Sequence, residues 1–210
     1  RAAPEDRFAG LAPEDRLASP PFPDLDLCDP AEPGPEALRD MALEAEDAAR
    51  AVPGVTNSEG ASASADGGVV ALATSHGFAG AYASGSRSLS ATVLSGEGAH
   101  MQRDNAWRQA RFGKDLPTPA EIGALAARRA VAKQNPGRLK SGPMPVVFDP
   151  RVAGTLVGHL LAAISGPAIA RRTSFLLDRL GDEVFAPGVR ILDDPHRTRG
   201  LRSRAFDGEG

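Results

Sequence analysis

The feature that most constrains the fold is a nearly uncharged stretch from Gly67 to Gly96, in which Arg87 is the only charged side chain. Small and β-branched residues alternate with serine and threonine along it, a pattern that indicates strands rather than helices. The predicted strands are Val69–Thr74, Phe78–Ser84 and Leu89–Leu94, with a turn at Ser75–Phe78. Together they predict an antiparallel β-meander with one face of small residues. Such a face can lie close against another sheet or accept an added strand from a peptide.

Helices are predicted on both sides of the meander. Pro35–Val52 carries apolar residues at three- and four-residue spacing and acidic residues on its other face. Thr118 and Glu121 form the sequence signature of a capping box, which predicts a helix over Ala120–Lys133. Between the meander and this helix, residues 99–112 are predicted to be a strand or an irregular edge, with Trp107 anchoring it to the core.

The last third of the chain alternates short apolar runs with turn residues. Asp149 and Pro150 suit the N-cap and first position of a helix, so they predict a helix over Pro150–Ile164. Leu156, Leu160 and Ile164 recur every four residues, and we expect their shared face to be core, with His159 on its margin. The other predicted elements are a buried strand at Pro145–Asp149, a helix at Thr173–Leu180 and a strand at Val189–Leu192.

This order of elements predicts an α+β fold, in which an antiparallel β-meander packs with helices and a strand–helix segment follows. We expect three parts along the chain. Residues 1–34 are rich in proline and are predicted to be the extended remnant of an N-terminal region. Residues 35–142 form the α+β domain with the meander, and residues 143–210 form a central segment that begins the C-terminal region.

Charge and cysteine content narrow the setting in which the chain works. Residues 1–66 hold 15 acidic and 5 basic side chains, whereas residues 67–210 hold 12 acidic and 19 basic ones. Complementary charge within the chain or across a partner explains this asymmetry better than a nucleic-acid surface, because lysines and stacking aromatics are few. No apolar run approaches the ~20 residues of a membrane span, and the lone Cys28 fits a reducing, cytoplasmic location. We therefore expect neither nucleic acid nor a membrane as a partner.

The ionisable residues form no recognisable catalytic or metal-binding motif. Zinc ligands on one helix need to lie about one turn apart, and the histidines have no such spacing. Asp193–His196 could bind a hard cation, although acids next to proline more often form a turn. Arg171-Arg172 and the arginines of residues 197–204 could bind carboxylates or phosphates, or form salt bridges with the acidic first third. We therefore assign no catalytic and no metal-binding residue to this chain. The four histidines are His76, His100, His159 and His196.

Seven stretches of the sequence occur together in a specific order. They are VPGVTNSEGASAS (52–64), ALATSHGFAG (71–80), LSGEGAHMQRD (94–104), PVVFD (145–149), GHLLAAISGPAIAR (158–171), TSFLLDRL (173–180) and ILDDPHRTRGLRSRAFDGEG (191–210). This ordered set resembles the TldD/PmbA family of peptidases, and within it the PmbA (TldE) type of subunit. The resemblance implies that the chain is an internal fragment, which a β-rich C-terminal domain follows in the longer family members.

The resemblance also implies what the predicted helix Pro150–Ile164 does. The zinc-binding subunit of the family carries HExxxH on this helix, and the matching positions here are Gly158, His159 and Ala163. Glycine and alanine have no lone pair to give to a metal, so this chain is expected to bind no zinc and no other cofactor. The family then implies a heterodimer in which a TldD-type subunit holds the zinc and this chain completes the cavity.

Two functions stay open at this point. The first is a metallopeptidase subunit, not catalytic alone, in a complex that degrades or processes unfolded or linear peptides. The second is a peptide- or partner-binding module without a proteolytic role, which uses the Val69–Leu94 meander as its surface. A metal-independent hydrolase is a third class, but no spacing of serine and histidine supports it. The residues expected to contact a peptide or partner are Arg171, Ser174, Arg199 and Asp207.

Overall fold

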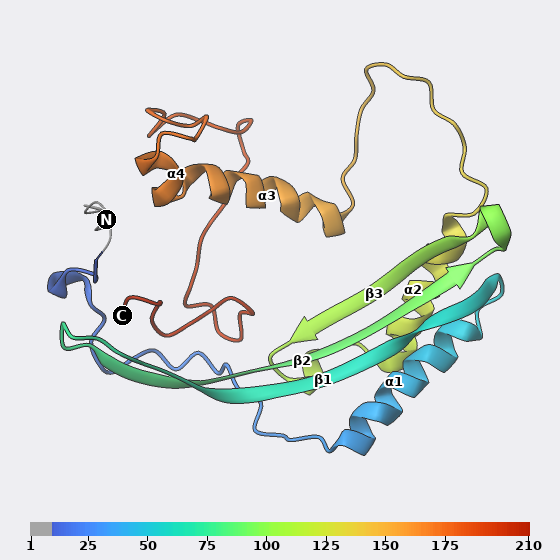
Figure 1. The fold of residues 1–210 in the computed structure, drawn as a ribbon, viewed down its shortest axis with the longest axis horizontal. Coiled ribbons are helices and arrows are strands. Elements are labelled where there is room, and N and C mark those ends of the chain that lie inside the picture. The colour runs from blue at the N-terminus through green and yellow to red at the C-terminus, as the bar shows by residue number, and fades with distance from the viewer. Residues whose placement is uncertain (1–9) are drawn as a thin grey trace, which may run out of the picture. The chain divides into compact units, whose positions relative to one another are not determined.

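The computed structural model describes residues 10–210, and these form two compact units (Figure 1). The first unit holds the chain up to Gly137 together with Asp193–Gly210, and the second holds Arg138–Leu192. An antiparallel sheet packed with helices makes the fold α+β, as predicted. No helix among residues 10–210 is both long and apolar enough to cross a membrane. The expected parts 1–34, 35–142 and 143–210 stay a prediction, because the two units describe only which residues pack together.

The sheet of the first unit contains β1 (Val55–Ala73), β2 (Ala79–Ser95) and β3 (Gln102–Ala110), in that spatial order and each antiparallel to its neighbour. A turn at residues 74–78 joins β1 to β2, as predicted. β3 pairs only with residues 87–95 of β2, so the β1–β2 hairpin continues beyond it with two strands (Figure 1). We call this two-stranded part, residues 67–73 and 79–85, the distal ribbon.

The predicted boundaries of the three strands are wrong. Phe78–Ser84 and Leu89–Leu94 both fall on the single strand β2, apart from Phe78 in the turn, and the third strand is β3. β2 continues without a break because Gly85 pairs in register with Gly67. β1 likewise begins well before Val69. Its serine, alanine and glycine residues favour strands only weakly, but pairing with β2 overrides that preference.

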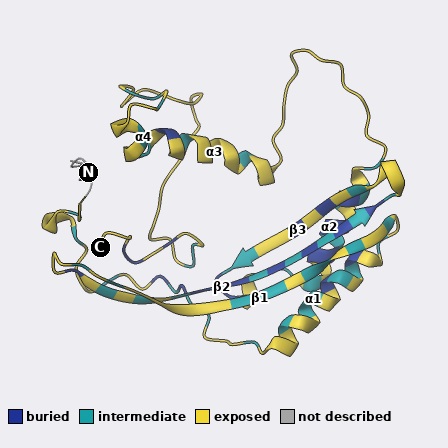
Figure 2. Ribbon diagram, viewed as in Figure 1, coloured by how far each residue is buried: buried dark blue, intermediate teal, exposed yellow. Residues whose placement is uncertain are grey.

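Helices α1 (Pro35–Arg50) and α2 (Pro119–Ala132) cover one face of the three-stranded part of the sheet, and both predicted helices are confirmed (Figure 1). Small and aliphatic side chains fill the space between these helices and the sheet, and they form the buried region of Figure 2. The fully packed members are Ala45, Ala49, Leu89, Ala91, Val93, Ala106, Ile122, Ala126, Ala127 and Ala130.

α2 begins with the predicted capping box. The Thr118 hydroxyl accepts a hydrogen bond from Glu121 N (3.3 Å), and the Glu121 carboxylate accepts one from Thr118 N (2.8 Å). The bond from the Thr118 backbone, with a smaller contribution from its hydroxyl, holds the pKa of Glu121 below its ordinary value. Both partners thereby satisfy backbone donors that a helix start leaves open.

β3 directs Trp107 away from the core. Asp104 and Ala106 are buried beneath the helices, so the alternate residues of β3 lie on the uncovered face of the sheet. Trp107 is 51% exposed, and the expectation that it anchors this strand to the core is wrong. Ala106 anchors it instead, together with an ion pair between Lys133 Nζ and Asp104 Oδ2 at 2.9 Å.

A cluster of aromatic rings fastens two distant segments to the distal ribbon. Phe22, Phe78, Tyr82 and Phe206 pack with ring centroids 4.9 to 5.8 Å apart. A Cβ on Gly80 would lie within 2.9 Å of both Phe22 and Phe206, so the rings need a glycine there. The segment before α1 and the C-terminal residues therefore pack with the sheet. Short 3-10 helices at Glu14–Arg16, Gly98–His100 and Gly113–Asp115 complete the first unit.

The second unit contains α3 (Pro150–Ile164) and the five-residue α4 (Gly166–Ala170). Asp149 Oδ1 accepts a hydrogen bond from Arg151 N at 2.8 Å, so the predicted N-cap and helix are confirmed. The helix predicted at Thr173–Leu180 is wrong, because that stretch forms turns. The helical turn occurs earlier in the chain, where Pro167 suits the first turn of a helix.

Three further expectations for the second unit are wrong. The structure has no strand at Pro145–Asp149 or at Val189–Leu192, and no other strand occurs among the described residues 138–192. Val147, expected to be buried, is 95% exposed. The supposed core face of α3 is also exposed at Leu156 and Ile164, with Leu160 only half-buried. A four-residue repeat tells which side chains share a face, but not what covers that face.

Candidate functional site

α3 carries the three positions that correspond to the zinc motif of the resemblance. Gly158 and His159 are exposed, and Ala163 is buried. A Cβ on Gly158 would meet no atom within 4 Å, so close packing does not require a glycine there. Structural zinc takes four protein ligands and catalytic zinc takes three, whereas this set offers one imidazole. These residues do not fit a zinc ion.

The acidic residues at Asp193–His196 form a hydrogen bond within their own turn. His196 N donates to Asp194 Oδ1 at 3.2 Å. Among residues 10–210, no three His, Cys, Asp or Glu side chains lie where they could share a metal ion. The geometry of Asp193–His196 is that of a turn, which aspartate and proline favour.

The four residues predicted to contact a peptide or partner belong to different units. In the second unit, Arg171 Nε donates to Pro167 O (3.1 Å), and Ser174 Oγ accepts from Leu176 N (3.0 Å). In the first unit, Asp207 Oδ1 accepts from the backbone N–H groups of residues 209 and 210 (2.9 and 3.2 Å). Each of these side chains therefore has a partner within its own unit, and a role in peptide or partner contact stays a prediction.

Arg199, the fourth of these residues, connects three segments. Its guanidinium lies 2.6 Å from Asp26 Oδ2 and 3.4 Å from Asp115 Oδ2, and its centre is 3.9 Å from the centroid of the Phe112 ring. The hydrogen bond with Asp26, opposed by partial burial, raises the pKa of Arg199 above its ordinary value. Arg199 N also donates to Leu25 O at 2.8 Å. Arg199 therefore ties the C-terminal residues to the segment before α1.

Arg111 is a buried residue that sequence reasoning missed. It follows β3 directly, and its guanidinium donates hydrogen bonds of 2.8 to 3.3 Å to five oxygen atoms. Two of these oxygens belong to Ser84 and Gly85 of β2, and the other three are carbonyls within residues 200–203. Nothing local in the sequence marks Arg111 for this role, because its partners lie far away along the chain.

Arg87 did carry a sequence signal, since it is the one charge in an otherwise neutral stretch. Its Nε lies 3.8 Å from Asp29 Oδ2, and its side chain also donates to the backbone carbonyls of Asp29, Ala31 and Asp66. Asp29 in turn accepts from Gly113 N (2.8 Å) and Ala31 N (3.0 Å). These two backbone bonds, opposed by burial and helped by Arg87, hold the pKa of Asp29 below its ordinary value.

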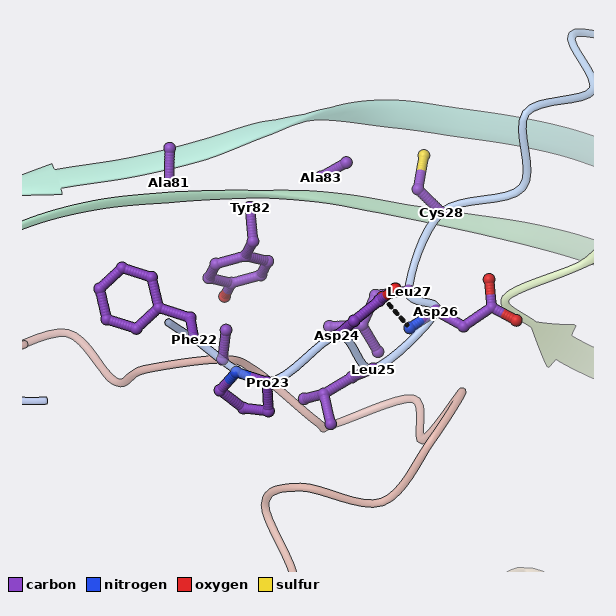
Figure 3. A pocket seen from close by; sticks show the side chains of 11 residues that line it. Phe22, Pro23, Asp24, Leu25, Asp26, Leu27, Cys28, Ala81, Tyr82 and Ala83 are labelled. Carbon is purple, nitrogen blue, oxygen red and sulfur yellow. Dashed lines mark hydrogen bonds between the residues drawn. The ribbon is translucent and has the colours of Figure 1, made fainter. Parts of the chain in front are cut away.

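A cavity of about 320 Å³ lies between β2 and the segment Phe22–Cys28 (Figure 3). Ala81, Tyr82 and Ala83 of β2 line one side of it. No strand among the described residues pairs with β2 on this side, because β3 reaches only as far as Arg87. Such an open strand edge beside a cavity can bind an extended peptide.

Two family models define the class of this protein. Residues 28–134 match the family model for the PmbA/TldA metallopeptidase central domain, and residues 141–210 match the one for the PmbA/TldA metallopeptidase C-terminal domain. The chain belongs to the PmbA/TldD family of metallopeptidases, as the ordered motifs predicted.

Individual relatives make the assignment more specific. The Metalloprotease PmbA of Escherichia coli O157:H7 is 40% identical over 98% of this chain and 46% of its own length. The Metalloprotease PmbA homolog of Haemophilus influenzae is 36% identical over the same shares. The chain thus spans about half the length of the curated relatives it matches.

A solved structure supports the same fold. The crystal structure of a Bacteroides thetaiotaomicron protein, described as a candidate modulator of DNA gyrase, is similar with a TM-score of 0.90 and 28% identity. The similarity covers 100% of this chain and 48% of that one. The α+β arrangement of sheet and helices is therefore that of the family.

Proposed function

We propose that this chain is the non-zinc-binding subunit of a two-subunit metallopeptidase. The other subunit, of the TldD type, holds the zinc. The observation that carries the proposal is the lack of metal ligands on α3. The chain belongs to a metallopeptidase family over both of its regions, yet Gly158 and Ala163 offer no metal ligand where the zinc-binding subunit of the family is expected to have histidines. A chain that keeps the helix without the ligands is suited to shaping a site whose metal belongs to another subunit.

The part of this chain in the complex is to complete the chamber that receives unfolded or linear peptides. α3 exposes Val152, Leu156 and Leu161, which a second subunit can bury. The expected contacts Arg171 and Ser174 follow this helix closely in the sequence. The half-buried free thiol of Cys28 is in keeping with a reducing location, and we place the complex in the cytoplasm.

A peptide- or partner-binding module without a proteolytic role is the second candidate. The edge of β2 at Ala81 and Ala83 favours this candidate, because it lines a cavity. Binding of a peptide at this edge would not require a metal ion. Main-chain groups of such an edge recognise extended peptides of many sequences. The two candidates differ in whether a zinc-bearing partner gains activity from this chain.

Reconstitution tests the proposal. The chain and a family member that carries HExxxH are purified separately, mixed, and assayed for cleavage of an unfolded peptide with and without a chelator. We expect no cleavage by this chain alone, a stable complex on mixing, and chelator-sensitive cleavage by the complex. Chelator-sensitive cleavage by this chain alone contradicts the proposal. Complex formation without any gain in cleavage over the partner alone supports the binding module instead.

A further inference from the structure

The outer edge of β2 is closed along most of its length and opens beside the cavity of Figure 3. β3 pairs with residues 87–95 of this edge. Next along the strand, Gly85 N donates to Leu27 O at 2.9 Å, and Gly85 O accepts from Arg111 Nη1 at 2.8 Å. The segment that contains Leu27 therefore meets the edge at Gly85 and leaves the cavity of about 320 Å³ beyond that point.

Ala81 and Ala83 lie on the open part of this edge. Thr74 N donates to Phe78 O at 2.9 Å across the turn, so even-numbered residues form the hydrogen-bonded pairs between β1 and β2. Odd-numbered residues of β2 therefore direct their N–H and C=O groups away from β1, as Gly85 does. Within residues 10–210, no backbone or side-chain group bonds to the outward groups of Ala81 and Ala83. Both residues thus offer a donor and an acceptor to a strand that enters from the cavity side.

The walls of the cavity are aromatic and negatively charged. Figure 3 shows the Tyr82 ring pointing from β2 toward Phe22 on the opposite wall. The Asp24 carboxylate also lines the cavity, and its Oδ1 accepts from Asp26 N at 3.1 Å. Asp26 has a cationic partner in Arg199, whereas no cation among the described residues pairs with Asp24. The cavity therefore offers two aromatic rings and one uncompensated negative charge.

We propose that this cavity binds an extended peptide with a lysine or arginine between two residues that pair with Ala81 and Ala83. The peptide runs antiparallel to β2, so each of these two residues exchanges both backbone hydrogen bonds with its alanine. The side chain between them projects on the same face as Tyr82, because residues opposite each other in a sheet share a face. Its apolar stem lies along the aromatic rings, and its charge faces Asp24.

The neighbouring contacts limit where the peptide pairs. Leu27 occupies the edge position beside Gly85, so the pairing ends at Ala83 on that side. An acidic residue in the middle of the peptide would bring its carboxylate toward Asp24, which like-charge repulsion disfavours. The inference rests on the peptide-binding role proposed above, and it adds the position of the peptide and the residue that the cavity selects.

Nuclear magnetic resonance with two capped tripeptides tests the site and its selectivity. The isotope-labelled 210-residue chain is titrated with acetyl-Val-Lys-Val-amide or acetyl-Val-Glu-Val-amide, without zinc and without a second subunit. We expect the backbone amide signals of Ala81 and Ala83 to shift saturably, with at least about threefold tighter binding of the lysine peptide. Equal or tighter binding of the glutamate peptide overturns the proposal, as does the absence of a shift at both alanines up to about 5 mM peptide. Saturable shifts confined to other residues overturn this site but leave the peptide-binding role standing.

Two matched proline substitutions locate the backbone contacts. Ala71 and Ala81 are register partners, and both are exposed. Ala81→Pro removes an N–H that points toward the cavity, whereas Ala71→Pro removes one at the opposite edge of the hairpin, and neither removes a bond between β1 and β2. Ala81→Pro should weaken binding of the lysine peptide at least about fivefold, and Ala71→Pro should leave it unchanged. Equal weakening by both substitutions contradicts the proposal.

A third substitution, Asp24→Asn, tests the charge. The asparagine keeps a side-chain oxygen that can accept from Asp26 N. Asp24→Asn should remove the preference for lysine over glutamate, and an unchanged preference contradicts the role assigned to Asp24.

Methylated peptides keep the proposal testable if Ala81→Pro does not fold. In the antiparallel register, the N–H groups of the two valines point to β2, and that of the lysine points away. Methylation of a valine nitrogen should weaken binding at least about fivefold, whereas methylation of the lysine backbone nitrogen should change it by less than about twofold. Stronger weakening by methylation at the lysine rules out the proposed register.

Discussion

Guanidinium groups connect segments of the first unit that lie far apart in the sequence. Arg87 binds residues 29–31, Arg111 binds residues 200–203, and Arg199 binds Asp26 and Asp115. An arginine offers five donors in a rigid fork, so it can hold several carbonyl groups at once. In a chain with few aromatic residues, these forks supplement a core made mainly of small side chains.

Replacing Arg111 by lysine should destabilise the protein although the charge is kept. The ammonium group cannot reach the oxygen atoms that the fork serves, and buried carbonyls lose their partners. We expect Arg111→Lys to lower the free energy of unfolding by about 2–4 kcal/mol in urea titrations. Arg108→Lys is the control, because Arg108 is exposed, and it should change stability by less than about 0.5 kcal/mol. Equal losses in the two variants would show that the fork at Arg111 does not matter.

Asp29 should make stability depend on pH in the acid range. Its pKa is lowered from the ordinary 3.8 in the folded state. A lowered pKa stabilises the fold above the unfolded value, and this stabilisation is lost as the pH falls through the folded value. Asp29→Asn should therefore be less stable at neutral pH, and its stability should converge with that of the unsubstituted chain below pH 3.8. Urea unfolding over a pH series measures this, and a difference that is constant down to the lowest pH contradicts it.

At the scale of elements, the contact between α1 and α2 depends on Gly123, which has no side chain. A Cβ on Gly123 would lie 2.0 Å from the carbonyl oxygen of Ala45 and 2.9 Å from Ala49 N. No rotamer change relieves a clash between a Cβ and a backbone. The two helices would have to move apart and give up part of the core they share.

A pair of identical substitutions tests this contact. Gly123→Ala should cost about 3 kcal/mol or more, since overpacking of a core typically costs 1–3 and here the clash is with backbone. Gly158→Ala on α3 has open space and should stabilise its helix by about 0.5–1 kcal/mol, the ordinary preference for alanine over glycine. Thermal unfolding of both variants makes the comparison. The account of the α1–α2 contact is wrong if Gly123→Ala is neutral or stabilising.

Helix starts were predictable from the sequence because their signals are local. The capping box at Thr118 and the N-cap at Asp149 each lie within a few residues of the helix that they begin. Strand ends were less predictable, because β2 continues through Gly85 only where β1 pairs with it. The exposure of Trp107 and of the Leu156 face was also missed, since burial depends on what packs on an element and not on its own pattern.

At the scale of the whole molecule, family membership was predictable from the sequence. The contacts that the buried arginines make between distant segments were not. The ordered motifs and the residue types at Gly158 and Ala163 can be read along the chain without any structure. The partners of Arg87, Arg111 and Arg199 come together only through the fold, and a single sequence contains no record of such pairs. The same holds for the cavity beside β2, which joins residues 22–28 to residues 81–83.

The central claim is that this chain shapes a peptidase whose zinc belongs to another subunit. The most direct test separates the reconstituted active complex into its two chains and measures zinc in each by elemental analysis. We predict that the zinc stays with the HExxxH-bearing chain and that this chain carries none in stoichiometric amount. About one zinc per copy of this chain, lost on His159→Ala, would contradict the account.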